Sequence, residues 1–335
     1  MNAIFYLKNR LSKTTIHLIK LFIGLVIVIL LINKYDFGKV LTHLMQVDLR
    51  LFCLAWAYGA IGIIAYAIVH KITLQPLKMN LTLWKLIKIS FQIRFYSLFM
   101  PGATNLLIKW YKLSQSGQQP AQALVLMGFT RLLHILALLI LTAVGIYYDV
   151  LFPWTSIQWI ILSCIILIVL AFAVLLSPVG QNLCDLIGHL KFPNWSFTKI
   201  IENKWSKLWN VIRNLNNISF LCIVILLLIN LVGHIFETFQ HQTLALAVDL
   251  DLNFWVFAWL RGVILVCSMI PFSFSGLGFR EASMIGLLIY YGIPEETALA
   301  YSIFYFSGFV LTKGIVGGLL EFSDFLLDTT KARKH

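Results

Sequence analysis

The chain has few charged residues and none of the common signatures of catalysis. Charged residues make up 12% of its 335 positions, whereas soluble domains carry about 25%. The sequence lacks a Walker-type phosphate loop, an aspartate-rich metal motif and the Ser/His/Asp or Cys/His patterns of nucleophilic enzymes. We therefore predict a protein that is not an enzyme and that uses no metal or cofactor.

Cysteine is also sparse, and its spacing excludes a metal or redox framework. The five cysteines show neither CxxC spacing nor histidine partners at metal-ligand distance. We interpret them as small apolar fillers: Cys53, Cys164, Cys184, Cys222 and Cys267.

Long hydrophobic runs fill most of the sequence instead. The chain is 60% hydrophobic, with a mean hydropathy of +0.86. Its net charge of +12 comes from Lys and Arg at the ends of the runs, which indicates membrane topology and not nucleic-acid binding. We predict a single all-α integral membrane domain over residues 1–335, because the runs are long enough to span a bilayer. Six full transmembrane helices are expected at about 16–32, 49–69, 121–147, 157–177, 218–247 and 298–322.

Two further hydrophobic regions are interrupted by residues that stop helices. The region 83–113 is broken near Pro101 and Gly102, and the region 254–291 is broken between Pro271 and Gly278. We predict that both are re-entrant helical hairpins, since each joins two segments on the same side of the membrane. Simple Pro/Gly kinks are the alternative. The residues expected to form the hairpin loops are Pro101, Gly102, Pro271, Gly276 and Gly278.

The distribution of charge predicts the orientation. Lysines and arginines near both termini place both ends in the cytoplasm, so the protein would be a multi-pass protein of the inner membrane. The two hairpins would then enter from opposite faces, and their similar flanking residues indicate an inverted-topology repeat. The basic stretch 178–217 is predicted to be a cytoplasmic loop, which could hold an interfacial helix.

Cations within the membrane segments are the candidate binding residues. A cation at the centre of a membrane helix costs about 2.5–3.5 kcal/mol on translocon scales, so it needs a partner. Since cations outnumber carboxylates at depth, we expect an anionic partner such as a lipid phosphate. The alternatives are snorkelling by Arg94 and Lys109, pairing of Arg131 with backbone carbonyls, and a salt bridge from Arg280 to Glu281 or a neighbour. The predicted substrate-binding residues are Arg94, Lys109, Arg131, Arg261, Ser273, Ser275, Arg280 and Glu281.

Three titratable residues share one face of the span 218–247. His234, Glu237 and His241 are spaced i, i+3 and i+7, which could bind a metal or relay protons. Hydrogen bonding between helices is the interpretation we favour. In the last span, Gly314 and Gly318 form a G-x-x-x-G pair that permits close helix packing, with or without a homo-oligomer.

Two motifs in the broken regions resemble those of a known family. They are Phe99-Met100-Pro101-Gly102, with Lys109-Trp110-Tyr111 and Arg131, and Pro271 to Ala282 with its Gly276-Leu277-Gly278-Phe279-Arg280-Glu281 core. In these residues, and over most of its length, the chain resembles the transmembrane domain of the lysylphosphatidylglycerol synthase/flippase family. The first motif departs from the family pattern, since Gly102-Ala103-Thr104-Asn105 replaces its glycine-aspartate stretch and Lys109 replaces its arginine.

The resemblance implies a function in lipid transport. It predicts a bacterial inner-membrane flippase that moves an anionic or modified phospholipid, or a lipid-linked phosphate, between leaflets. Arg131, Lys109 and Arg280 would hold the phosphate. The alternatives are a membrane subunit of, or partner to, a lipid aminoacyl- or glycosyl-transferase, and a structural component of envelope polysaccharide assembly.

Overall fold

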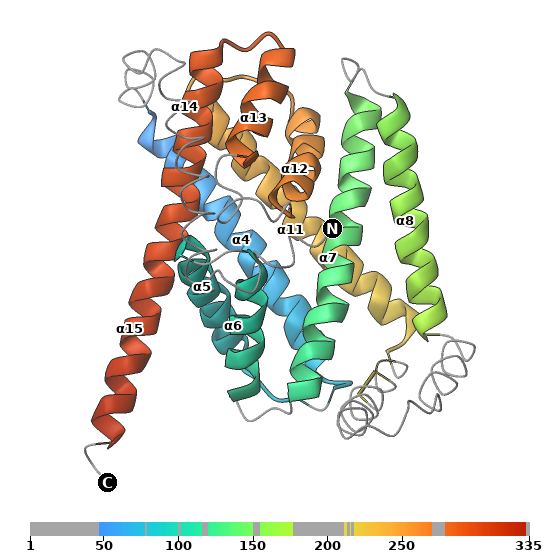
Figure 1. The fold of residues 1–335 in the computed structure, drawn as a ribbon, viewed down its shortest axis with the longest axis vertical. Coiled ribbons are helices and arrows are strands. Elements are labelled where there is room, and N and C mark those ends of the chain that lie inside the picture. Colours follow the sequence, from blue (N-terminus) through green and yellow to red (C-terminus); the bar gives the residue numbers. More distant parts are fainter. Residues whose placement is uncertain are drawn as a thin grey trace, which may run out of the picture. The chain divides into compact units, whose positions relative to one another are not determined.

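The computed structural model describes residues 47–77, 79–99, 102–115, 120–149, 155–176, 211–212, 215, 218–269 and 279–332. Every long regular element in these ranges is a helix, as predicted (Figure 1). In chain order the helices are α4 (Leu49–Leu74), α5 (Leu83–Phe99), α6 (Gly102–Gln115), α7 (Pro120–Tyr148), α8 (Thr155–Leu176), α11 (Phe220–Leu246), α12 (Phe254–Met269), α13 (Phe279–Tyr290), α14 (Glu295–Tyr305), the π-helix η2 (Phe306–Leu311) and α15 (Thr312–Ala332).

Four helical stretches are long and apolar enough to cross a bilayer. They are α4, α7, α11 and the continuous stretch Glu295–Asp324 through α14, η2 and α15, with 26 to 30 residues each. About 20 apolar residues suffice to span the hydrocarbon layer. Helix α8 occupies the predicted span 157–177, and the predicted span 16–32 lies outside the described residues. The four stretches match the predicted spans 49–69, 121–147, 218–247 and 298–322.

The two interrupted regions form pairs of shorter helices. Helices α5 and α6 have 17 and 14 residues, and α12 and α13 have 16 and 12. Helix α5 ends at Phe99 and α6 begins at Gly102, so the first break falls where Pro101 predicts it. The second break lies between Met269 and Phe279. Each of these helices is therefore shorter than a typical full span.

Contacts between residues divide the chain into two compact units. Unit 1 comprises Met1–Gly59, Lys88–Ile108 and Thr238–His335. Unit 2 comprises Ala60–Ile87 and Lys109–Glu237. The boundaries fall inside α4, α5, α6 and α11, so each of these helices contributes to both units.

The core of unit 1 is formed by α12, α13 and α14. Helix α13 packs against both neighbours, and large aromatic side chains fill the contacts. Phe257 lies edge-on to Tyr301, and Trp259 lies 6.1 Å from Tyr291 between ring centroids. After α13, Gly292 adopts a φ of 74°, a left-handed conformation that glycine adopts without strain, and Pro294 then precedes α14. This tight turn keeps α13 and α14 side by side.

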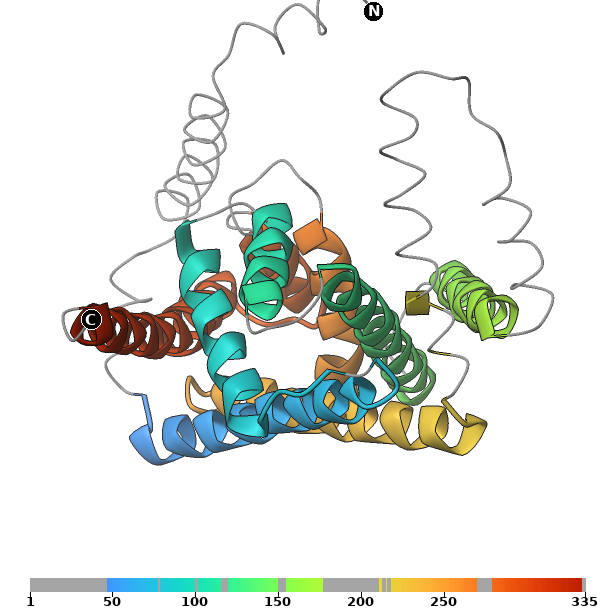
Figure 2. The same cartoon turned by 90° about the horizontal axis from the view of Figure 1, so that it is seen from below.

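Helix α5 packs against α15 through a face of glycines (Figures 1 and 2). A methyl group added at Gly317 would lie 2.0 Å from the backbone oxygen of Phe91. Beyond the glycines, Lys88 and Gln92 both donate hydrogen bonds to Asp324. Tyr96 donates to Glu321 over 2.8 Å. The part of α5 in unit 1 is thus fixed to the last span by close backbone approach and by polar contacts.

Unit 2 is built from the second part of α4, the start of α5, the end of α6, α7, α8 and the first part of α11. Helices α7 and α8 pack against each other (Figure 1). Helix α4 meets α11 at two glycines, because Gly62 faces Glu237 and Gly233 faces Tyr66. The predicted loop 178–217 lies almost entirely outside the described residues, and the single-domain organisation stays a prediction.

The last span is not a regular α-helix throughout. Between α14 and α15 the six residues Phe306–Leu311 form a π-helix, whose turns are wider than those of an α-helix. Such segments are uncommon and are often found at functional sites.

Candidate functional site

In unit 2, His70 connects α4 with α6. Its Nδ1 lies 2.7 Å from the backbone oxygen of Tyr66, which can only accept a hydrogen bond, so Nδ1 carries the proton. Its Nε2 lies 2.9 Å from Nζ of Lys109, an ammonium group that can only donate. Thr130 of α7 lies 3.4 Å from the same nitrogen but donates to the carbonyl of Leu126. A neutral imidazole therefore holds the Lys109 ammonium.

Arg131 follows Thr130 on α7, and its side chain is exposed. The helix begins at Pro120, so a rise of about 1.5 Å per residue places Arg131 roughly 16 Å along a span of about 43 Å. A guanidinium at this depth is unfavourable in hydrocarbon and requires water, an anion or a path to the surface. The structure thus brings Lys109 and Thr130 to the same nitrogen of His70, and it leaves the Arg131 side chain exposed.

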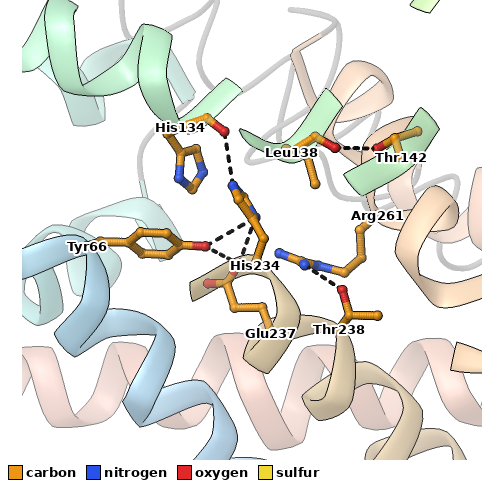
Figure 3. A network of polar contacts seen from close by, with 8 residues as sticks. All are labelled: Tyr66, His134, Leu138, Thr142, His234, Glu237, Thr238 and Arg261. Atoms are coloured by element: carbon orange, nitrogen blue, oxygen red, sulfur yellow. Dashed lines mark hydrogen bonds and ion pairs between the residues drawn. The ribbon is translucent and has the colours of Figure 1, made fainter. Parts of the chain in front are cut away.

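A second polar group in unit 2 joins α4, α7 and α11 (Figure 3). The hydroxyl of Tyr66 lies 2.9 Å from Oε2 of Glu237 and 3.2 Å from Nδ1 of His234. Nε2 of His234 lies 3.0 Å from the backbone oxygen of His134. The His234 side chain is almost fully buried, and that of Glu237 is 15% exposed. Hydrogen bonding between helices, the interpretation favoured from the sequence, is confirmed for His234 and Glu237.

In unit 1, Arg280 and Glu281 lie in the first turn of α13. Both are buried, and Arg280 donates from Nε and Nη2 to Oε1 of Glu281. The guanidinium also lies 5.4 Å from the ring centroids of Tyr305 and Phe306. The salt bridge that the sequence left open therefore forms, and aromatic faces stabilise the same cation.

The other predicted cations of unit 1 are Arg261 and Arg94. Arg261 of α12 is buried and donates to the hydroxyl of Thr238 over 2.9 Å (Figure 3). Arg94 of α5 is half-buried. His241 of α11 bonds the hydroxyl of Tyr301 over 2.8 Å. In the described part of the chain, no three His, Cys, Asp or Glu side chains lie close enough to hold a metal ion.

A column of aromatic residues on the last span ends at another buried cation. Tyr301, Tyr305, Phe309 and Lys313 follow each other at intervals of four residues. The rings of Tyr305 and Phe309 are stacked, with centroids 5.8 Å apart. Nζ of Lys313 lies 3.3 Å from the centroid of Phe309, and its residue is only 1% exposed.

Comparison with family models decides the family. The model of the lysylphosphatidylglycerol synthase TM region matches residues 17–311. The chain belongs to this family. No curated protein matches the chain. The family match confirms the resemblance seen in the sequence and, together with the apolar helices, shows a multi-pass membrane protein.

Parts of both motifs that carried the family resemblance lie outside the described residues, whereas other parts lie at the starts of helices. Gly102 is the first residue of α6, and Arg280 and Glu281 begin α13. The two breaks between these helices lie outside the described residues. The predictions that fall there concern Pro101, Pro271, Ser273, Ser275, Gly276 and Gly278.

The sequence analysis missed several polar residues of this family member. Lys313 stands inside the predicted span 298–322, and its charge within an apolar run was the available signal. Tyr66 stands in the predicted span 49–69, His70 follows directly after that span, and His134 stands three residues after Arg131. Polar side chains inside predicted spans were therefore informative even when they were not Arg or Glu.

Proposed function

We propose that the protein is a transporter that moves an anionic phospholipid or a lipid-linked phosphate between the leaflets of the inner membrane. The observation that carries this proposal is the presence of two cations among the helices of unit 2, the exposed Arg131 within the span α7 and the Lys109 ammonium, which contacts His70. A lipid phosphate supplies an anion that such cations favour, while its acyl chains stay in the hydrocarbon. Arginine is well suited to this task because it can bind a phosphate bidentately.

In unit 1, we propose Arg280 as a candidate phosphate-binding residue in its own right. Its bonds to Glu281 use Nε and Nη2, whereas a guanidinium has five N–H donors. Its position at the start of α13 adds backbone N–H groups and the positive end of the helix dipole. The residues that are buried in the described part include three cations, Arg261, Arg280 and Lys313, and one carboxylate, Glu281. This excess of positive charge favours an anionic ligand.

We propose that the lipid head group crosses the membrane along the broken helices. We propose that α5 with α6, and α12 with α13, are re-entrant hairpins of an inverted repeat, with both termini in the cytoplasm. Their short lengths support this arrangement. Within unit 1, the residues of α5 and α6 between Lys88 and Ile108 lie toward the end of the unit opposite to α12 and α13 (Figure 1). Transporters with broken helices bind ions where the half-helices meet.

Transport can be tested by reconstituting the full chain into liposomes. We expect the wild-type protein to speed the exchange of fluorescent phosphatidylglycerol between leaflets. Replacing Lys109 and Arg131 together by glutamine should slow this exchange about tenfold, which corresponds to raising its free-energy barrier by about 1.4 kcal/mol. Arg50→Gln is the matched control, since Arg50 is exposed at the start of α4 and lies outside the site. If neither phosphatidylglycerol nor a polyprenyl phosphate moves faster than in empty vesicles, the transport function is wrong.

A membrane partner of a lipid aminoacyl- or glycosyl-transferase is the second candidate, because the family is named after the membrane region of a synthase. The two candidates differ in what loss of the protein does to cells. Loss of a transporter leaves the total amount of the lipid unchanged and alters its distribution between leaflets. Loss of a transferase subunit lowers the total amount of the modified lipid.

A further inference from the structure

The side chains of Tyr66, His234 and Glu237 form a triad in unit 2 whose hydrogen bonds depend on the number of protons it holds. One hydroxyl group, that of Tyr66, lies between a carboxylate oxygen at 2.9 Å and an imidazole nitrogen at 3.2 Å (Figure 3). A hydroxyl has a single proton to donate. It can satisfy the carboxylate or the imidazole, but not both.

The backbone fixes the other side of the imidazole. Nε2 of His234 faces the carbonyl oxygen of His134 at 3.0 Å, and a carbonyl can only accept. Nε2 therefore carries a proton in every state. In the neutral ring Nδ1 is then an acceptor, so its hydrogen bond with Tyr66 requires the hydroxyl proton.

Two proton arrangements satisfy every bond, and both hold the same number of protons. In one, a charged His234 donates from Nδ1 to Tyr66, and Tyr66 donates to ionised Glu237. In the other, protonated Glu237 donates to Tyr66, and Tyr66 donates to neutral His234. Removing one proton to water leaves ionised Glu237 and neutral His234, so one acceptor then faces the oxygen of Tyr66 without a proton between them.

The packing of α4 against α11 prevents the side chains from simply moving apart. A methyl group on Gly62 would lie 2.9 Å from Cγ of Glu237, and one on Gly233 would lie 2.9 Å from Cε1 of Tyr66. Each helix thus places a glycine opposite a triad residue of the other. We expect the helices to move when the unfavourable contact at the Tyr66 oxygen is relieved. Proton release would then be accompanied by a change of conformation.

Charged and titratable groups with described contacts next to the triad include one histidine and one arginine. His134 of α7 faces both rings, with its centroid 4.6 Å from Tyr66 and 4.4 Å from His234. Thr238, the next residue of α11, accepts a bond from Arg261 of α12. The guanidinium keeps its charge at every physiological pH. Among the residues named here, changes of charge at physiological pH therefore fall on the triad and His134.

We propose that Tyr66, His234 and Glu237 form a proton-binding site that couples lipid movement to the proton gradient. This inference rests on the proposed transport function for its biological role, whereas the proton site itself does not. The protonated triad holds α4 and α11 together, and the deprotonated triad releases them. If one proton moves with each lipid, a gradient of one pH unit can drive about tenfold accumulation.

The test uses the full chain in liposomes that contain fluorescent phosphatidylglycerol and a trapped pH-sensitive dye. We expect an imposed gradient of one pH unit to change the distribution of the labelled lipid by up to about tenfold, with proton entry reported by the dye. Glu237→Gln should abolish both responses. The glutamine amide donates to Tyr66 as the protonated carboxyl does, so this variant should fold while fixing the triad in one state.

A matched control removes a polar group from the same helix. Asn230 is buried one turn before His234 and donates only to the carbonyl of Leu226 among the contacts described. Asn230→Leu should therefore respond to the gradient as the wild type does. Tyr66→Phe should lose the response, because it removes the bridging hydroxyl.

Three outcomes separate the two hypotheses. If the lipid moves but ignores the gradient in the wild type, coupling is wrong and the transport function stands. If no lipid moves, transport is wrong, and proton uptake by the purified protein then decides the site. Over the pH range of the transport assay, titrations of the wild type and Glu237→Gln that differ by one proton support the site, and identical titrations over that range overturn it.

Discussion

Replacing Gly317 by alanine is expected to lower the stability of the protein more than any other glycine-to-alanine change on the face of α15 that meets α5. The added methyl would lie 2.0 Å from the backbone oxygen of Phe91, which cannot rotate away. At Gly314 the nearest group is the Leu98 side chain, which can. We expect a loss of about 3 kcal/mol, at the upper end of the cost of overpacking. Thermal unfolding of the purified protein in detergent measures it.

A matched glycine provides the control for this prediction. Gly286 is in α13, also in unit 1, and nothing lies within 4 Å of a methyl group placed there. Gly286→Ala should leave the unfolding temperature unchanged or raise it slightly, since alanine favours the helix. Equal unfolding temperatures for Gly317→Ala and Gly286→Ala would show that α5 does not approach α15 this closely.

The second large effect concerns the buried pair Arg280 and Glu281. Glu281→Gln should destabilise the protein by about 3–5 kcal/mol, because it leaves a buried guanidinium without its carboxylate. The double variant Arg280→Met with Glu281→Gln should recover most of this loss, since removing both charges also removes the desolvation cost. Thermal unfolding of the wild type and both variants gives the comparison.

Lipid movement separates the two roles of Arg280. If the guanidinium contacts phosphate, the double variant should be stable and yet move phosphatidylglycerol more slowly than the wild type. Wild-type transport by the double variant would show that Arg280 serves the fold alone. Wild-type stability of Glu281→Gln would show that the negative charge of Glu281 is not required to stabilise the guanidinium, which also faces the rings of Tyr305 and Phe306.

Much of the fold follows from sequence because lipid restricts the chain to few solutions. Backbone groups in hydrocarbon must bond within the helix, so long apolar runs give spans directly. The break before Gly102 followed from proline, which cannot continue the hydrogen-bond ladder. The family could also be recognised, because the Gly276-Leu277-Gly278-Phe279-Arg280-Glu281 core is local in sequence.

The polar contacts were harder to predict because they join residues far apart in the chain. Lys109 was expected to bind an external phosphate, yet its first described partner is His70, 39 positions earlier. Nothing in the local sequence of either residue indicates this pairing. The salt bridge between Arg280 and Glu281 was one of two alternatives in the sequence analysis. Adjacent residues on a helix point in different directions, so their side-chain rotamers decide whether the charged groups meet.

The π-helix η2 determines which side chains share one face of the last span. Side chains four residues apart on an α-helix diverge by about 40° at each step, since one turn takes 3.6 residues. Over three steps, Tyr301 and Lys313 would point to different sides. The wider turn at Phe306–Leu311 rotates less per residue and cancels part of this divergence. The number of residues in this segment, and not only their chemistry, thus decides whether a lysine can share a ring surface with the tyrosines before it.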